Sequence, residues 1–275
     1  MAGQKLLIGT SGYDYPEWKG VFYPQDLKRA DFLSYYATQF NAVELNNTFY
    51  NMPTAQRLFS FYERSQGKLL FSVKANRLLT HQVGRDCLTA AGDFRAAITP
   101  LAQKGALSAA LFQFPQSFRY TDDNRIYLAK LVAAFEGFPI AIEFRHAEWI
   151  RPSVFAGLEE RGDSLVFCDM PALRALPDGK TLRTPFVGTG AYIRMHGRNQ
   201  NAWYASGTQE PYPDNGAARY NYDYSDAELE SFVPIVQTAL HEGRPTQIYF
   251  NNHPNGHGAR NAKKLRELVG EVTER

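Results

Sequence analysis

The feature that most constrains this chain is a series of short apolar runs that become polar on alternate residues toward their C-terminal ends. In the run 139–146, Ile140, Ile142 and Phe144 share one parity. Glu143 and Arg145 share the opposite parity. Side chains alternate between the two faces of a strand, so the ionisable pair faces away from the bulky apolar set. A buried ion without a partner costs on the order of several kcal/mol, so this pair must face other charged groups or a polar cavity.

Polar residues recur on one parity in most of the other runs. They are Glu44 and Asn46 in 42–46, Ser72 and Lys74 in 70–74, Tyr192, Arg194 and His196 in 191–196, and Gln247, Tyr249 and Asn251 in 247–251, with weaker matches at Gln113 and at Asp169, which is set against Cys168. If the apolar parity meets helices and the polar parity points inward, the C-terminal strand ends surround a hydrophilic mouth.

Segments with helical spacing alternate with these runs, which predicts a parallel (β/α)8 TIM-type barrel formed by a single domain over residues 1–275. The remaining strands are expected at 6–9, 107–114 and 165–169. Residues 170–190 are rich in proline and glycine, so the sixth helix is expected to be missing or irregular. A doubly wound open sheet is the alternative, but no Gly-x-Gly-x-x-Gly motif follows the first run.

Several helix ends have local signals. Pro53 suits the first turn of the second helix, and the fifth helix is expected to begin near Pro152 and end at Gly162. The run 225–228, Ser-Asp-Ala-Glu, predicts a capping box, and Pro234 is expected to kink the helix that follows it.

Composition limits the class of protein. A formal net charge of +2 gives no support for a nonspecific nucleic-acid or membrane-surface protein. Two cysteines, Cys87 and Cys168, are too few for a disulfide framework, and Cys168 is expected to be a buried, inert thiol. No apolar run approaches about 18 residues, and a strand near Lys5 leaves no room for a signal peptide, so we expect a cytoplasmic protein without membrane contact.

Several separate motifs, spread over nearly the whole chain, together resemble one family. They are 9–13 (GTSGY), 18–20 (WKG), 22–24 (FYP), 43–50 (VELNNTFY), 112–115 (FQFP), 143–146 (EFRH) with Trp149, 194–197 (RMHG) and 249–252 (YFNN). The chain is similar to the YecE-like family, which is defined by a domain of unknown function. The resemblance implies a parallel α/β barrel in a bacterial or archaeal cytoplasmic protein, and it implies no reaction.

The candidate site residues lie at strand ends and in the loops that follow them. The candidates for catalysis are Glu44, Glu143, Arg145, Asp169, Arg194 and His196. The candidates for binding are Tyr13, Trp18, Asn46, Lys74, His81, Trp149, Arg198, Asn251, Asn252, Gly256 and Gly258. The charged residues could equally be ion pairs that fill the barrel mouth, and the tryptophans could be core packing. No His-x-x-x-His or comparable local pair exists, so no metal site is assigned and the cofactor stays unknown.

Two classes of function remain open, with a small anionic ligand or a nucleic-acid fragment as the partner and the oligomeric state unknown. One is an enzyme for a polar anionic substrate such as a sugar phosphate or a nucleotide fragment, possessing basic residues to hold the anion and Glu44, Glu143 or His196 to move protons. The other is a noncatalytic module that binds a nucleic-acid end or a phosphorylated metabolite. A glycoside hydrolase using Glu44 and Glu143 is a further alternative, which an arginine between the two carboxylates would weaken.

Two loops carry further expectations. The Tyr-rich segment from Asn199 to Tyr224 is long for a connection and is expected to act as a lid. The start of the last helix, with Gly256 and Gly258, is expected to form an anion site together with Arg194 and Arg198.

Overall fold

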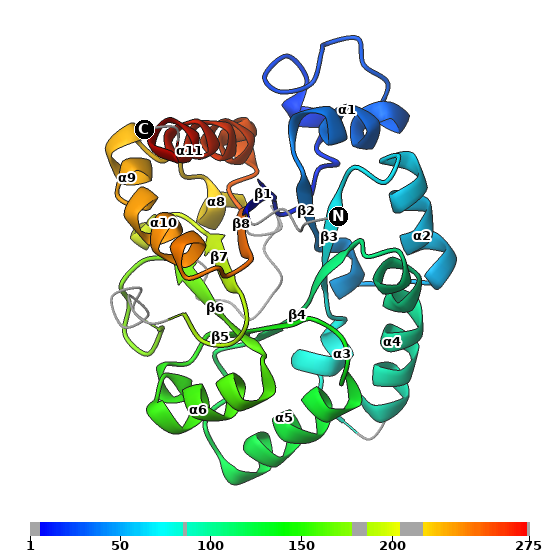
Figure 1. The fold of residues 1–275 in the computed structure, drawn as a ribbon, viewed down its shortest axis with the longest axis vertical. Helices are drawn as coiled ribbons and strands as arrows, with labels where there is room; N and C mark the ends of the chain where they lie inside the picture. Colours follow the sequence, from blue (N-terminus) through cyan, green and yellow to red (C-terminus); the bar gives the residue numbers. More distant parts are fainter. Residues whose placement is uncertain (1–5, 85–86, 178–185, 204–216, 274–275) are drawn as a thin grey trace.

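Eight parallel strands form the nearly closed ring of a TIM-type barrel, as the alternation predicts (Figure 1). The computed structural model of the protein describes residues 6–84, 87–177, 186–203 and 217–273. The strands are β1 (Leu6–Thr10), β2 (Ala42–Leu45), β3 (Leu70–Lys74), β4 (Leu107–Phe114), β5 (Ile140–Phe144), β6 (Ser164–Asp169), β7 (Ala191–Met195) and β8 (Thr246–Phe250). Their order around the ring, β1-β8-β7-β6-β5-β4-β3-β2, follows the chain.

Helices surround this ring (Figure 1). They are α1 (Phe32–Gln39), α2 (Ala55–Arg64), α3 (Arg77–Thr80), α4 (Cys87–Gln103), α5 (Asp122–Ala134), α6 (Pro152–Arg161), α7 (Gln200–Trp203), α8 (Ala217–Tyr220), α9 (Asp226–Glu230), α10 (Val233–His241) and α11 (His257–Thr273). Between β6 and β7 the described residues, 170–177 and 186–190, contain no helix, and 178–185 lie outside the described residues. No helix in the described ranges is long and apolar enough to cross a membrane.

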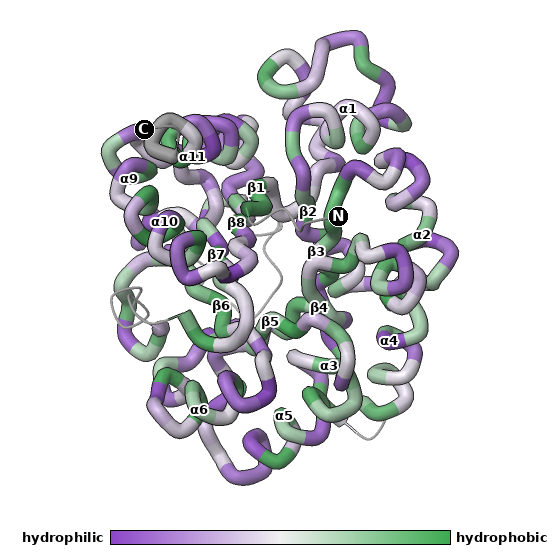
Figure 2. Tube along the Cα trace, in the orientation of Figure 1, coloured by the Kyte–Doolittle hydropathy of each residue, from purple (hydrophilic) through white to green (hydrophobic). Residues whose placement is uncertain are grey.

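The strands separate two hydrophobic layers, as their alternating parity predicts. Val43, Val73 and Ile142 belong to the outer layer, between the ring and the helices. Leu111 and Ala141 belong to the second layer, inside the barrel. Figure 2 shows hydrophilic stretches on the surrounding helices, whereas β5 and β6 are largely hydrophobic. The inner layer contains fewer residues than the outer one, so the C-terminal ends of the strands are left to polar side chains.

The local signals at helix ends are partly confirmed. The capping box at Ser225 and Glu228 is formed, Pro152 opens α6, and Gly162 ends α6 with a φ of 75°. The expectation for Pro53 is wrong, because Thr54 caps α2 and Pro53 precedes the cap. Pro234 does not kink one helix but lies in the first turn of a second one, α10, where its missing N–H has no partner to lose.

The seam between β1 and β2 is closed mainly by side chains. The amide of Asn41 accepts from the Ile8 N–H at 3.0 Å and donates to the Leu6 carbonyl at 2.9 Å. The Tyr36 hydroxyl accepts from the Thr10 N–H at 2.8 Å and donates to the Ala42 carbonyl at 3.1 Å. Side chains from α1 and the turn after it therefore substitute for part of a β-ladder.

We expect Tyr36→Phe to lower the free energy of unfolding by about 1–3 kcal/mol, because it leaves the buried Thr10 N–H and Ala42 carbonyl without this partner. Urea unfolding followed by circular dichroism measures the change. Tyr35→Phe, in the same helix, is the matched control and should change stability by less than about 0.5 kcal/mol. Equal stability of the two variants would show that the hydroxyl bridge contributes nothing.

Candidate functional site

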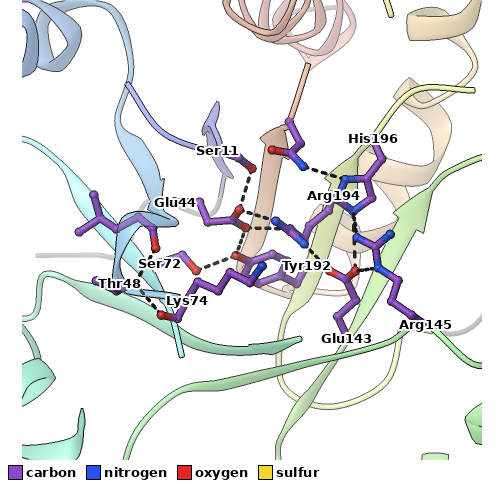
Figure 3. Close-up of polar contacts among 12 residues, drawn as sticks. Ser11, Glu44, Thr48, Ser72, Lys74, Glu143, Arg145, Tyr192, Arg194 and His196 are labelled. Atoms are coloured by element: carbon purple, nitrogen blue, oxygen red, sulfur yellow. Dashed lines mark hydrogen bonds and ion pairs between the residues drawn. The ribbon is translucent and has the colours of Figure 1, made fainter. Parts of the chain in front are cut away.

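Arg194 lies at the centre of the barrel mouth, between two buried carboxylates (Figure 3). It extends inward from β7 and holds Glu44 of β2 with a two-pronged contact, Nε to Oε2 at 2.9 Å and Nη2 to Oε1 at 2.7 Å. Its Nη1 donates to Oε2 of Glu143, on β5, at 2.5 Å. The side chains of all three residues are at most 1% exposed, so this is a charge cluster withdrawn from water.

Hydroxyl groups complete the coordination of Glu44. Ser11 Oγ donates to its Oε1 at 2.7 Å, and the Tyr192 hydroxyl donates to its Oε2 at 2.8 Å. Ser72 Oγ lies 2.6 Å from the Tyr192 hydroxyl (Figure 3). Each oxygen of Glu44 therefore receives two hydrogen bonds, and the carboxylate is locked in place.

Glu143 is locked in a similar way. Its Oε1 accepts from Arg145 Nε, and its Oε2 accepts from Arg194. Burial alone would raise the pKa of Glu143, but the attraction of the two guanidinium groups outweighs it and holds this pKa well below its usual range. Glu143 is thus ionised at neutral pH and has no proton to donate. This weakens the glycoside hydrolase alternative, because Arg194 lies between the two carboxylates and neither is a ready general acid.

His196 is neutral and fixed in one tautomer. Burial, with Arg145 nearby, lowers its pKa to about 3. Arg145 Nη2 lies 3.0 Å from His196 Nε2, and because arginine only donates, Nε2 must accept. The ring proton is then on Nδ1, and the side-chain amide of Asn251, 3.2 Å away, accepts this proton when its oxygen faces the ring. Asn251, a predicted binding residue, therefore orients this histidine.

Cys168 and Asp169 have the opposite orientations to those expected. The register of β6 turns Val166 and Cys168 into the barrel, and Asp169 lies on the other parity. Asp169 accepts from Arg198, with Nη2 to Oδ1 at 2.9 Å, and from the Tyr224 hydroxyl at 2.6 Å. Asp169 and Arg198 thus form a separate pair away from the central arginine, and Arg198 also approaches Glu228 at 3.3 Å.

A potential metal-ligand set is present in the described residues, since ligand atoms of Glu143, Cys168 and His196 all lie within 4.8 Å of one another. Burial raises the pKa of the Cys168 thiol well above its usual value, so the thiol is protonated in the metal-free protein. Arg145 already donates to both Glu143 and His196. Two guanidinium charges beside the set would repel a cation, so the residues present do not fit a metal ion.

A cavity of about 230 Å³ opens beside this cluster. Arg145, Gln113 and His81 line it, together with Arg219 and the aromatic rings of Trp203 and Tyr220. The Arg145 guanidinium lies 5.6 Å from the Trp203 ring, and the Tyr220 ring lies 5.8 Å from that of His196. The described ends of the Tyr-rich segment therefore cover the mouth, while its residues 204–216 lie outside the described part of the chain.

Tyr13 and Asn46 line a different cavity. It measures about 450 Å³ and lies beside α2, where Arg57 and Arg64 contribute to its wall. The structure thus divides the predicted binding residues between two places.

The two predicted tryptophan platforms are packing residues. Trp18 is fully buried, its Nε1 donates to the His253 carbonyl at 2.7 Å, and its ring packs on Tyr15. Trp149 is 1% exposed, its Nε1 donates to the Phe118 carbonyl at 2.7 Å, and its ring stacks on Phe144. Both rings are enclosed and both N–H groups are already bonded to the main chain, which favours the packing alternative over ligand binding.

The glycine N–H groups that were expected to hold an anion at the start of α11 already have main-chain partners. The Gly258 N–H donates to the Asn252 carbonyl at 2.7 Å, and the Gly256 N–H donates to the His253 carbonyl at 3.2 Å. These glycines shape the turn, and Arg194 and Arg198 are bound to carboxylates elsewhere. Asn252 supports the cover of the mouth, because its side-chain amide donates to the Tyr220 carbonyl at 3.3 Å.

Lys74, at the end of β3, completes the mouth. Its Nζ lies 4.3 Å from the centre of the Phe49 ring, and Figure 3 shows the chain reaching toward Tyr192 and Arg194. Burial, reinforced by Arg194, lowers its pKa to about 7. In the part of the chain that the structure describes, no carboxylate forms an ion pair with this amine.

The candidate site residues named from the sequence leave out two groups of residues at the mouth. Ser72 and Tyr192 have the inward parity, which could have identified them. Trp203, Arg219 and Tyr220 come from the segment after β7, and no periodic pattern there indicates which residues turn back over the barrel.

Comparisons with known proteins agree with this architecture. A family model described as "Protein of unknown function DUF72" matches residues 7–275. UPF0759 protein YunF of Bacillus subtilis is 28% identical over 96% of this chain and 94% of its own length, and UPF0759 protein YecE of Escherichia coli is 24% identical over 65% and 64%. The crystal structure of a DUF72 family protein from Thermotoga maritima superposes with a TM-score of 0.81 at 32% identity, over 96% of this chain and 99% of that one. The structure of a DUF72 family protein from Enterococcus faecalis superposes with a TM-score of 0.76 at 23% sequence identity, over 96% of this chain and 95% of that one.

Proposed function

The chain belongs to the DUF72 family of proteins of unknown function, and from the chemistry of its barrel mouth we propose that it is an enzyme acting on a small, polar, anionic substrate. The observation that carries the proposal is the cavity beside the buried cluster, which has arginines and aromatic rings in one wall. A sugar phosphate or a nucleotide fragment has both features that this wall recognises, an anionic group and a ring.

The balance of charge supports an anionic ligand. Among the described residues whose contacts are known, Arg145, Arg194 and Lys74 bring three positive charges to the mouth when Lys74 is protonated, and the carboxylates Glu44 and Glu143 bring two negative ones, which leaves one positive charge in excess. The cavity is partly closed by protein, where the field of an unbalanced charge is stronger than in water. A bound anion would neutralise this excess.

Roles follow from how tightly each group is held. Glu44 and Glu143 fix Arg194 and Arg145, so we assign them to positioning. Arg145 lines the cavity and is assigned to the anion. Burial lowers the pKa of Lys74 to about 7, which suits a group that gains and loses a proton during turnover.

We expect the affinity for small anions to depend on the mouth and not on the neighbouring ion pair. In isothermal titration with inorganic phosphate and with phosphorylated sugars, Arg145→Gln should weaken binding at least about tenfold, since it removes a charge-assisted contact. Arg198→Gln is the matched control, because Arg198 is held by Asp169 away from the cavity. Equal affinities of the two variants would place the anion elsewhere.

A noncatalytic module that binds a nucleic-acid end or a phosphorylated metabolite is the second candidate. The observation that favours it is the locking of both carboxylates, which leaves few groups free to do chemistry. Turnover separates the two candidates. Incubating the wild type with phosphorylated sugars and oligonucleotides, with and without divalent metal ions, should yield product; binding that never leads to product favours the module.

A further inference from the structure

We propose that Lys74 is a nucleophile whose ε-amine forms an imine with the carbonyl carbon of an anionic aldehyde or ketone, such as a 2-oxo acid or a phosphorylated sugar in its open-chain form. This inference rests on the proposed function and names the substrate class of the same site. It concerns one amine at the end of β3, on the face where barrel strands present their reactive side chains.

The position of Lys74 is the first argument. It shares the inward parity with Ser72, whereas Val73 between them packs in the outer layer. Its Nζ lies 4.3 Å from the centre of the Phe49 ring, and this ring lies 4.8 Å from that of His81, which lines the cavity of the mouth. The amine therefore lies behind the rings of Phe49 and His81, next to the cavity that Arg145 lines.

The environment of the amine is the second argument. A lysine that serves only structure normally has an acidic partner, and in the described residues no ion pair joins Lys74 to one. Burial, reinforced by the neighbouring Arg194, lowers the pKa of Lys74 to about 7, so roughly half of the amine is neutral at pH 7. Only the neutral form has the lone pair that attacks a carbonyl, which is how buried lysines are activated for imine formation.

The chemistry is balanced without an oxidant or reductant. The lone pair of Nζ attacks the carbonyl carbon, the C=O π bond breaks, and a proton moves from nitrogen to oxygen to give a carbinolamine. The C–O bond then breaks, the oxygen leaves as water after taking up a second proton, and a C=N bond remains. When protonated, this imine draws electrons from the adjacent carbon and so permits a C–H or C–C bond there to break.

Arginine and lysine have separate tasks in this arrangement. Arg145 and Arg219 line the wall that would bind the carboxylate or phosphate, and Lys74 lies beyond His81 and Phe49. A substrate held by its anionic end would present its carbonyl to the amine. A neutral carbonyl compound of the same size lacks the anionic group that the arginines would bind. Comparing how fast the anionic and the neutral compound modify Lys74 therefore tests the arrangement.

Reductive trapping of the native protein tests the proposal. The protein is incubated at pH 7 with glyoxylate, or with the uncharged glycolaldehyde, in the presence of sodium cyanoborohydride, and the modified lysines are found by peptide mass spectrometry. We expect Lys74 to be modified at least about tenfold faster than the exposed Lys68, Lys104 and Lys130. We expect glyoxylate to prefer Lys74 over these lysines more strongly than glycolaldehyde does.

The outcomes distinguish the two proposals. If glyoxylate binds in calorimetry but leaves Lys74 no more modified than the surface lysines, the imine is overturned and the anion site stands. If both aldehydes modify Lys74 equally, the imine stands and the anionic preference fails. If neither aldehyde modifies Lys74 preferentially, the nucleophile is overturned whether or not an anion binds.

A second measurement needs no variant. Trace acetylation of the native protein between pH 5 and pH 11 reports the titration of each amine, and Lys74 should show a midpoint close to 7, whereas a midpoint like that of Lys68 overturns the proposal.

Two variants serve as controls for the trapping experiment. Lys74→Met should abolish trapping at this position, and Lys68→Met, a substitution outside the mouth, should leave trapping at Lys74 unchanged.

Discussion

Arg194→Met is expected to lower the free energy of unfolding by about 3–5 kcal/mol, because it leaves two fully buried carboxylates without their shared cation. The methionine fills much of the same volume, so the loss reports charge and not a cavity. Urea unfolding at pH 7, followed by fluorescence and by circular dichroism, measures it. Coincident transitions in the two signals would show that the variant still unfolds in one step.

Two controls isolate the cause. Arg198→Met removes an arginine whose side chain is 39% exposed, and should cost at most about 1 kcal/mol. Combining Arg194→Met with Glu44→Gln and Glu143→Gln removes both charges with their partner, and should recover part of the loss. If the triple variant is less stable than Arg194→Met alone, the unpaired carboxylates are not the cause.

The stability of the wild type should fall as the pH is lowered from about 6.5 toward 4, by about 3 kcal/mol from His196 alone. The sign follows from proton uptake. The pKa of His196 is lowered to about 3 in the folded protein, while the unfolded chain has a value near 6.5. Between these values the unfolded state binds the additional proton, so acid favours unfolding. Below about pH 4.5, Glu143 acts in the same direction, because its folded pKa is also lowered.

Unfolding free energies measured from pH 7 to pH 4 test this dependence. In His196→Gln the slope between pH 6.5 and pH 5 should decrease, although the variant itself is less stable. The exposed His241, at the end of α10, provides the control, and His241→Gln should keep the slope of the wild type. A wild-type curve that is flat over this interval contradicts a neutral, buried His196.

The barrel and the direction of most inward residues could be predicted from the sequence because they depend on local repetition. A period of two places Glu44, Glu143 and Arg194 on the inner face, and the alternation of strand and helix brings their ends together. Three charges on one inner face also made ion pairing an open alternative, and the observed pairing of both carboxylates with Arg194 weakens the glycoside hydrolase alternative.

The predictions that failed concern side chains whose partners come from other segments of the chain. Asp169 and Cys168 face the opposite sides of the strand to those expected. The pairing of β6 with β7 sets these directions, and the sequence of residues 165–169 alone does not reveal them. Trp18 and Trp149 follow strand ends, as binding residues do. The indole N–H of each donates a hydrogen bond to a main-chain carbonyl of another segment. Periodicity carries no information about such partners.

The seam between β1 and β2 has a consequence for synthesis of the chain. β1 leaves the ribosome first, yet its continuous ladder is with β8, which follows it by more than two hundred residues. Until then the first strand is joined to its neighbour by the side-chain bridges of Tyr36 and Asn41 and by the contacts of Ser11 and Gly12 with Glu44, and not by a continuous ladder. The ring therefore closes only after its last strand has emerged, and during translation the other elements assemble as an open, curved sheet.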